Sequence, residues 1–127
     1  MSTLIDSSIW IDYFRGAGRT ETVDLLIEEN LVVSNDLVLA ELIPALHLRR
    51  QKRLITLLRQ VKRSPIVIDW EDITTMQITC IRNGVNGVGI PDLIIAQNAI
   101  QNDLRLLSSD KHFELMSRYV PLSLHEY

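Results

Sequence analysis

The chain has 127 residues, of which 46% are hydrophobic and 23% are charged, and its formal net charge is -3. This length and composition are typical of one globular domain with its own core, expected over residues 1–127, and they exclude a disordered or collagen-like chain. No segment approaches the ~20 apolar residues that a membrane helix requires, so we expect a soluble, cytoplasmic protein.

The N-terminal part of the chain predicts two strands separated by a helix. Thr3–Ile5 and Leu31–Val33 are short apolar runs rich in β-branched residues, which favour buried strands. Thr20 is a candidate helix cap, and apolar residues from Val23 to Ile27 follow it at helical spacing. The chain is therefore predicted to begin with a strand–helix–strand unit.

The next stretch is predicted to be helical and strongly basic. Pro44 follows Glu41 and should kink this helix or divide it into two. No acidic residue occurs from Leu42 to Ile68, whereas seven basic residues do: Arg49, Arg50, Lys52, Arg53, Arg59, Lys62 and Arg63. We expect the leucines at positions 54, 57 and 58 to face the core and the basic side chains to point outward. Such a stretch fits a polyanionic or acidic partner, and it fits a solvated helix face equally well.

The C-terminal half continues the alternation of strands and helices. Ile66–Ile68 and Arg105–Leu107 are predicted strands, and helices are predicted over Ile73–Ile81 and Leu93–Ile100. A loop with three glycines separates these helices, and its first glycine, Gly84, suits a helix C-cap. The whole pattern predicts an α/β fold: a single domain with a central, mainly parallel β-sheet flanked by helices on both faces.

Four carboxylates lie where functional groups gather in such a fold. Asp6 and Asp110 follow predicted strands, and the carboxyl ends of parallel strands meet at one edge of the sheet. Asp92 follows Pro91 at the start of a buried helix, where an N-terminal cap is its simplest structural explanation. Glu41 lies among apolar residues, where a carboxylate needs a partner or a metal.

Together these acids predict a metal site. Carboxylates that share a site raise one another's pKa values, so a protein usually neutralises such a cluster with a hard cation. Oxygen ligands favour Mg²⁺, with Mn²⁺ as a second possibility, over zinc, because the chain has no histidine pair and only one cysteine, Cys80. Since Mg²⁺ is usually completed by substrate phosphate, the site predicts chemistry on phosphate esters.

The sequence around the four acids resembles known motifs. The four stretches are LIDSSIWID at 4–12, SNDLVLAEL at 34–42, GIPDLIIA at 89–96 and LLSSDKHF at 106–113. In this order they are similar to the acidic motifs of the PIN-domain family, particularly of the VapC toxins of bacterial toxin–antitoxin pairs. The similarity extends over nearly the whole chain.

This resemblance implies an Mg²⁺- or Mn²⁺-dependent endoribonuclease, the toxin of a type II toxin–antitoxin pair, which hydrolyses RNA phosphodiesters with metal-activated water. Asp6 and Asp92 would be the main metal ligands, and Glu41 and Asp110 would complete the acidic site. Two serines, Ser8 and Ser108, match positions whose hydroxyls orient the carboxylates, although turn or capping roles explain them as well.

The resemblance also implies partners. These are an RNA substrate, a second copy of the chain in a homodimer, and a cognate antitoxin whose tail fills the active-site groove. The candidate contacts with RNA or antitoxin are Arg49, Arg50, Lys52 and Arg53.

Several other residues have simpler structural explanations. The three histidines form no metal-binding pair, and we expect His112 on the surface or in a loop, with a general-base role as the less favoured alternative. The aromatic residues Trp10, Tyr13 and Phe14 could stack on RNA bases, but their helical spacing favours packing against a core. The same expectation applies to Trp70.

Other classes of protein fit the sequence less well. A phosphoacceptor receiver domain needs an acidic pair after the first strand and a late lysine followed by proline, whereas Asp6 precedes two serines and Lys111 precedes His112. A haloacid-dehalogenase-like phosphatase needs a second aspartate at Ser8. Two alternatives within the PIN fold stay open: an RNA-processing nuclease outside a toxin–antitoxin pair, and a non-catalytic RNA- or protein-binding module.

Overall fold

Four short parallel strands lie at the centre of the protein in the computed structural model, which describes residues 1–127. They are β1 (Thr3–Ile5), β2 (Val32–Val33), β3 (Arg105–Leu107) and β4 (Ser123–Leu124), in the sheet order β2-β1-β3-β4. Leu4 pairs with Val33 on one side and with Leu106 on the other. β1 is buried throughout and β3 is buried except at Arg105, because helices cover the sheet.

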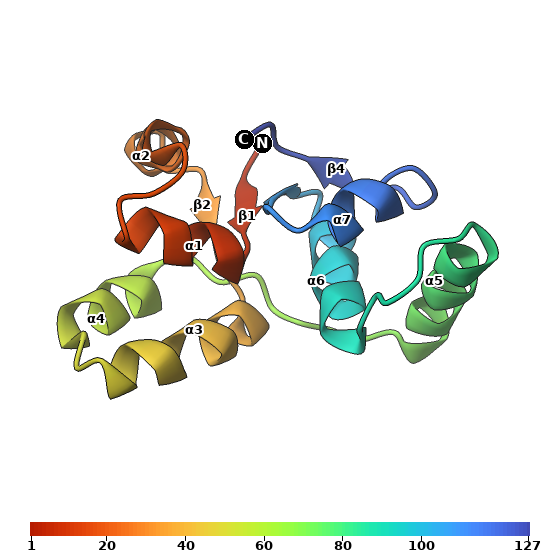
Figure 1. Ribbon diagram of the computed structural model, residues 1–127, viewed down its shortest axis with the longest axis horizontal. Helices are drawn as coiled ribbons and strands as arrows, with labels where there is room; N and C mark the ends of the chain where they lie inside the picture. The colour runs from red at the N-terminus through yellow and green to blue at the C-terminus, as the bar shows by residue number, and fades with distance from the viewer.

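Seven helices connect and cover these strands. They are α1 (Ser7–Phe14), α2 (Thr20–Glu28), α3 (Asp36–Leu48), α4 (Lys52–Gln60), α5 (Trp70–Arg82), α6 (Ile90–Gln101) and α7 (Lys111–Met116). Figure 1 shows α1 to α4 gathered toward β2, and α5 to α7 on the side of β4. The predicted α/β fold with a parallel sheet is confirmed. None of the helices combines the length and the apolar character needed to cross a bilayer.

The core explains why α6 is apolar on most sides. Leu93, Ile95, Ala96 and Ala99 are each at most 1% exposed, and they belong to one cluster of 27 buried hydrophobic residues. A helix enclosed in this way fixes the position of its own N-terminus firmly. The first turn of α6 is therefore a rigid platform for the side chains it carries.

The strand predicted at Ile66–Ile68 is wrong. Pairing beyond β2 ends after a single bridge between Ser34 and Arg63, because the neighbouring segment leaves the sheet after Ser34 and begins α3 at Asp36. Side chains of α6 hold the extended segment instead: the Gln97 amide bonds to the backbone N and O of Asp69 at 3.1 and 3.0 Å. In Figure 1 this segment links α4 to α5 beneath the sheet.

Other sequence predictions differ from the structure in detail. Helix α3 continues through Pro44 to Leu48, so the proline does not divide it. Leu57 and Trp70 are 51% and 58% exposed, contrary to the prediction that they face the core, because no other element covers those faces of α4 and α5. Gly84 does cap α5: its φ of 76° lets the Val85 amide reach back to the Cys80 carbonyl at 2.8 Å.

Candidate active site

Asp6 is the most firmly held acid of the predicted site. It directly follows β1, and its backbone amide donates to the Leu107 carbonyl of β3 at 2.9 Å. Its side chain is buried, and Oδ2 accepts hydrogen bonds from the hydroxyls of Ser8 at 3.0 Å and Ser108 at 2.8 Å. The other oxygen, Oδ1, accepts no hydrogen bond from the protein and is left for a ligand.

The turn after β3 links Asp6 to Asp110. The Asp110 amide donates to Ser108 Oγ at 3.1 Å, and the Ser109 amide donates to Ser8 Oγ at 3.3 Å. Asp110 then caps α7, because its Oδ1 accepts the His112 amide at 2.9 Å. Short polar side chains thus hold the two strand-end acids in one hydrogen-bonded frame.

Glu41 and Asp92 reach this edge of the sheet from helices. Glu41 lies on α3, whose buried cap Asn35 accepts the Val38 amide at 2.9 Å. Asp92 lies in the first turn of α6, but the cap residue is Gly89 and the helix has no side-chain cap hydrogen bond. The cap explanation of Asp92 is therefore wrong, because the chain enters the helix before Pro91.

The structure brings all four predicted acids close enough to affect one another. Partial burial raises the pKa of Glu41 above its ordinary value, and the charges of Asp6 and Asp92 raise it further, although Glu41 keeps an exposed side. Partial burial also raises the pKa of Asp92, as do Asp110 and Asp6, whereas His112 and the Gly89 backbone act in the opposite direction. The site therefore holds an excess of negative charge.

His112, predicted to lie on the surface or in a loop, is in the first turn of α7, where its side chain is 36% exposed and lies at this site. It is the second residue of α7, and its Nδ1 is 3.6 Å from Asp110 Oδ1 and 3.8 Å from Asp92 Oδ2. The signal available in the sequence was its spacing, two residues after an acid that caps a helix. A side chain in the first turn of a helix leans back toward the N-terminus, which here is the acid site.

The side chains present fit a divalent cation. Asp92, Asp110 and His112 offer one ligand atom each within 4.8 Å of one another, and Asp6 Oδ1 has no protein partner. Partial burial raises the pKa values of Glu41 and Asp92 most, and a cation would offset the further rise that the neighbouring acids cause. Carboxylate oxygens are the ligands that Mg²⁺ and Mn²⁺ prefer.

The model of the PIN-domain family matches residues 3–119 of this sequence, nearly the whole chain. The chain belongs to the PIN-domain family. This match includes all four acids and both serines of the site. A comparison with curated protein sequences gave no match.

Solved structures share this PIN fold along the full chain. The VapBC2 structure from Rickettsia felis, bound to a promoter DNA fragment, gives a TM-score of 0.78 at 18% identity, covering 100% of this chain and 99% of that chain. VapBC-1 from nontypeable Haemophilus influenzae gives 0.75 at 20% identity, with 99% and 98% covered. FitAcB from Neisseria gonorrhoeae gives 0.72 at 18% identity, with 98% and 96% covered. At these identities the likeness shows a common fold.

The basic residues lie at the junction of α3, the helix that carries Glu41, and α4. Arg49 and Arg50 follow α3, Lys52 and Arg53 begin α4, and all four are exposed. Arg49 also lines a cleft of about 220 Å³ that Glu41 borders. Arg49 is the only one of these four basic residues that lines this cleft, and Glu41 is the only one of the four acids that does.

Proposed function

We propose that this PIN domain is a metal-dependent endoribonuclease and the toxin of a type II toxin–antitoxin pair. The observation that carries the proposal is the convergence of Asp6, Glu41, Asp92 and Asp110 from four separate segments, with one oxygen of Asp6 left unpaired. A divalent cation bound there would supply a Lewis acid that activates water and polarises a phosphodiester.

The chain's own residues would position this chemistry. Asp6 and Asp92 would hold the cation, with Glu41 and Asp110 completing the acid site. Ser8 and Ser108 would keep the Asp6 carboxylate in one orientation, because both hydroxyls donate to the same oxygen. These serines contact an acid and not the substrate, so they are positioning residues.

Substrate binding would depend on the basic residues at the junction of α3 and α4. A phosphodiester backbone is attracted by exposed Arg and Lys side chains without any need for base contacts. Arg49 is the strongest candidate of the four, since it lines the cleft that Glu41 borders, which Arg15 also lines. A positive wall beside a metal site fits a single-stranded, flexible nucleic acid better than a small phosphate ester.

The enzymatic proposal is tested by incubating the purified protein with end-labelled RNA. We expect cleavage with Mg²⁺ or Mn²⁺, none with chelator, and recovery when the metal is added back. The same assay with Asp103→Asn serves as a control, because Asp103 is exposed, lies outside the acid site and has a φ of 51° that Asn also tolerates. Absence of cleavage under every metal condition would favour a non-catalytic binding module.

A protein antitoxin is proposed as the partner of this site. The similar solved structures include toxin–antitoxin complexes, and one, from Klebsiella pneumoniae, carries that description. Between α1, α2 and α4 the chain also has an apolar groove of about 430 Å³, lined by Trp10, Phe14 and Leu57 among others.

Expression in a bacterium should arrest growth for the wild type and not for Asp6→Asn. A nuclease outside a toxin–antitoxin pair would leave growth unaffected.

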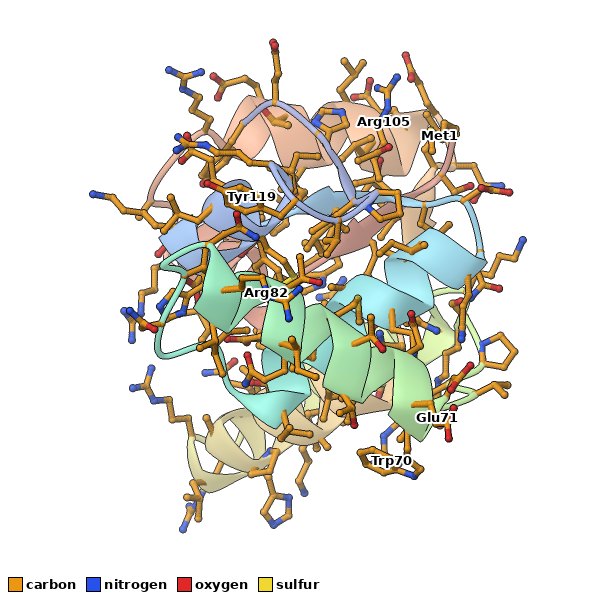
Figure 2. The ribbon with its side chains drawn as sticks, turned by 90° about the vertical axis from the view of Figure 1, so that its right-hand side faces the viewer. Met1, Trp70, Glu71, Arg82, Arg105 and Tyr119 are labelled. Atoms are coloured by element: carbon orange, nitrogen blue, oxygen red, sulfur yellow. The ribbon has the colours of Figure 1, made fainter.

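We also propose a homodimer formed through α5. Trp70, Ile78 and Ile81 are 58%, 48% and 59% exposed, and helical spacing places them on one side of the helix. Figure 2 shows the Trp70 side chain projecting from the start of α5. A self-complementary apolar patch suits a two-fold interface. Light scattering should give a dimer for the wild type and a monomer for Trp70→Glu; an unchanged mass would exclude this face.

A further inference from the structure

The imidazole of His112 is the one nitrogen donor directed at the acid site. Its Nδ1 lies 3.6 Å from Asp110 Oδ1 and 3.8 Å from Asp92 Oδ2. The other two histidines do not contribute: His47 is exposed in the last turn of α3, and His125 Nδ1 contacts the backbone oxygen of Glu126. A nitrogen ligand at this site could therefore come only from His112.

The backbone fixes where this ring lies. Asp110 Oδ1 accepts the His112 amide at 2.9 Å, so the acid and the histidine are held together at the start of α7. The other face of the ring meets the glycine-rich loop, where a Cβ on Gly87 would lie 3.7 Å from Nε2. Gly87 has a φ of 79°, which favours glycine, so no side chain there crowds the ring.

The spacing of the three donor atoms suits chelation. Two ligand atoms bound at about 2.1 Å to one divalent ion lie roughly 3.0 to 3.5 Å apart in octahedral or tetrahedral geometry. The observed separations of 3.6 and 3.8 Å exceed this range by a few tenths of an ångström, which small rotations of partly exposed side chains cover. An ion pair between a charged imidazole and the two carboxylates would give similar distances, so the experiment must separate the two cases.

We propose that His112 Nδ1, beside Asp92 and Asp110, is a further ligand of the cation at the acid site, and that this nitrogen makes the site bind Mn²⁺ in preference to Mg²⁺. The inference rests on the proposed function, because it names a further ligand of the same site. Mg²⁺ takes oxygen ligands almost exclusively, whereas first-row transition-metal ions also accept imidazole nitrogen. Binding through Nδ1 leaves the proton on Nε2, the nitrogen that faces the Gly87 loop.

The decisive measurement is pulsed electron paramagnetic resonance on Mn²⁺ bound to the full chain. A directly bound histidine gives a nitrogen coupling, and labelling the histidines with ¹⁵N changes that coupling without any substitution. We expect the coupling in the wild type and in His47→Gln, and its loss in His112→Gln and His112→Asn. Thermal melts in chelator check that each variant is folded.

Binding constants provide the second readout. His112→Gln should weaken Mn²⁺ binding by about tenfold or more, at least the loss seen when an outer-shell partner of a metal ligand is removed. Mg²⁺ binding should change by less than about threefold, since oxygen ligands dominate it. The ratio of the two Kd values should therefore move toward Mg²⁺ in His112→Gln and stay unchanged in His47→Gln.

Two contrary results are distinguishable. If wild type binds Mn²⁺ without nitrogen coupling while Asp6→Asn loses Mn²⁺ binding, the acid site stands and His112 is only an ion-pair partner. If wild type binds neither Mn²⁺ nor Mg²⁺, both this inference and the proposed metal-dependent function are wrong. Retention of the coupling in His112→Gln would also overturn the assignment.

Discussion

The acid site and the basic junction of α3 and α4 are built in opposite ways. Asp6 is 6% exposed and accepts two hydroxyl hydrogen bonds, and Asp110 accepts a backbone amide. The basic residues at the junction are Arg49, Arg50, Lys52 and Arg53. All four are exposed, and none of their side chains forms a hydrogen bond or an ion pair. Hydrogen bonds hold the carboxylates of Asp6 and Asp110 in place, whereas the basic side chains have no such contacts.

This difference follows from what each charge must do. A cation needs ligand oxygens held within a few tenths of an ångström, and the chain supports Asp6 and Asp110 with hydroxyls and amides and carries Asp92 on a rigid helix start. Attraction of a polyanion depends on the sum of many charges and tolerates motion of each one. Substitutions should therefore have large effects at the acid site and small, additive effects at the basic junction.

The largest effect should come from removing a ligand. Asp6→Asn and Asp92→Asn each keep the size of the side chain and remove a negative charge. Each should lower metal-dependent RNA cleavage by on the order of a hundredfold or more, at least the loss seen when an outer-shell partner is removed. Single-turnover cleavage rates, with circular dichroism to confirm folding, measure this effect. Near-normal rates in both variants at moderate Mg²⁺ would contradict the assignment of the site.

Loss of a positioning hydroxyl should have the next largest effect. Ser108 donates to Asp6 Oδ2 and accepts the Asp110 amide, so Ser108→Ala loosens two acids at once. We expect a loss of cleavage of about 10- to 100-fold, and a smaller loss for Ser8→Ala. Ser109→Ala is the matched control, because the Ser109 hydroxyl forms no hydrogen bond. Equal rates in Ser108→Ala and Ser109→Ala would show that the hydroxyl frame has no catalytic role.

The positions of the acids are easier to predict from sequence than their surroundings. Asp6 and Asp110 are predictable because strand ends of a parallel sheet converge, whatever the loops do. The proximity of His112 is not, because its direction depends on where α7 begins, and only the cap formed by Asp110 determines that. The incorrect N-cap prediction for Asp92 has the same origin, since sequence gives helix starts only to within a few residues.

Errors in the fold have a related cause. Ile66–Ile68 has the composition of a strand, but composition does not supply a partner strand, and the neighbouring segment enters α3 just after its bridge at Ser34. The spacing of the leucines in α4 indicates an apolar face, but periodicity does not reveal how much of that face is covered. Leu58 is buried at 2% exposure, whereas Leu57 borders the open apolar groove at 51%.

Neutralising the basic junction should have a moderate, graded effect. Replacing Arg49, Lys52 and Arg53 with glutamine should weaken RNA binding and reduce the slope of log Kd against log salt by up to about one for each phosphate that is no longer neutralised. Cleavage at saturating RNA should change little, because the acids are untouched. A salt series of binding measurements by fluorescence anisotropy checks both points.

The control for the basic junction removes the same charge elsewhere. Arg82, Arg105 and Arg118 are exposed and lie outside the basic stretch, so their triple glutamine variant has the same net charge. It should bind RNA almost as the wild type does. If both triple variants bind equally well, the basic junction is only a solvated helix face.

The smallest effect should be on stability, and its sign distinguishes a cluster of acids from a set of ion pairs. The pKa of Glu41 and of Asp92 is raised in the folded protein, so the folded state binds more protons than the unfolded state between the ordinary and the raised values. Stability of the metal-free protein should therefore be greatest below the ordinary pKa values and fall as pH rises through the raised ones. Acids held in ion pairs would give the opposite trend.

Asp92→Asn tests this sign directly. Near neutral pH and in chelator, the variant should melt on the order of a few °C above wild type, because it loses a carboxylate that burial and Asp110 make costly to ionise. At a pH of about 4, near the ordinary pKa of an aspartate, this difference in melting temperature should shrink. Near neutral pH, added Mg²⁺ should stabilise wild type more than the variant, since the ion binds the folded state.

Glu71→Gln is the control for this test. Glu71 is also an acid in the first turn of a helix, but it lies on α5, so its loss removes only a favourable interaction with the helix dipole. A variant that melts below wild type in chelator and responds equally to Mg²⁺ would mean that Asp92 serves the helix dipole of α6, and the clustered-acid assignment would fail at that residue.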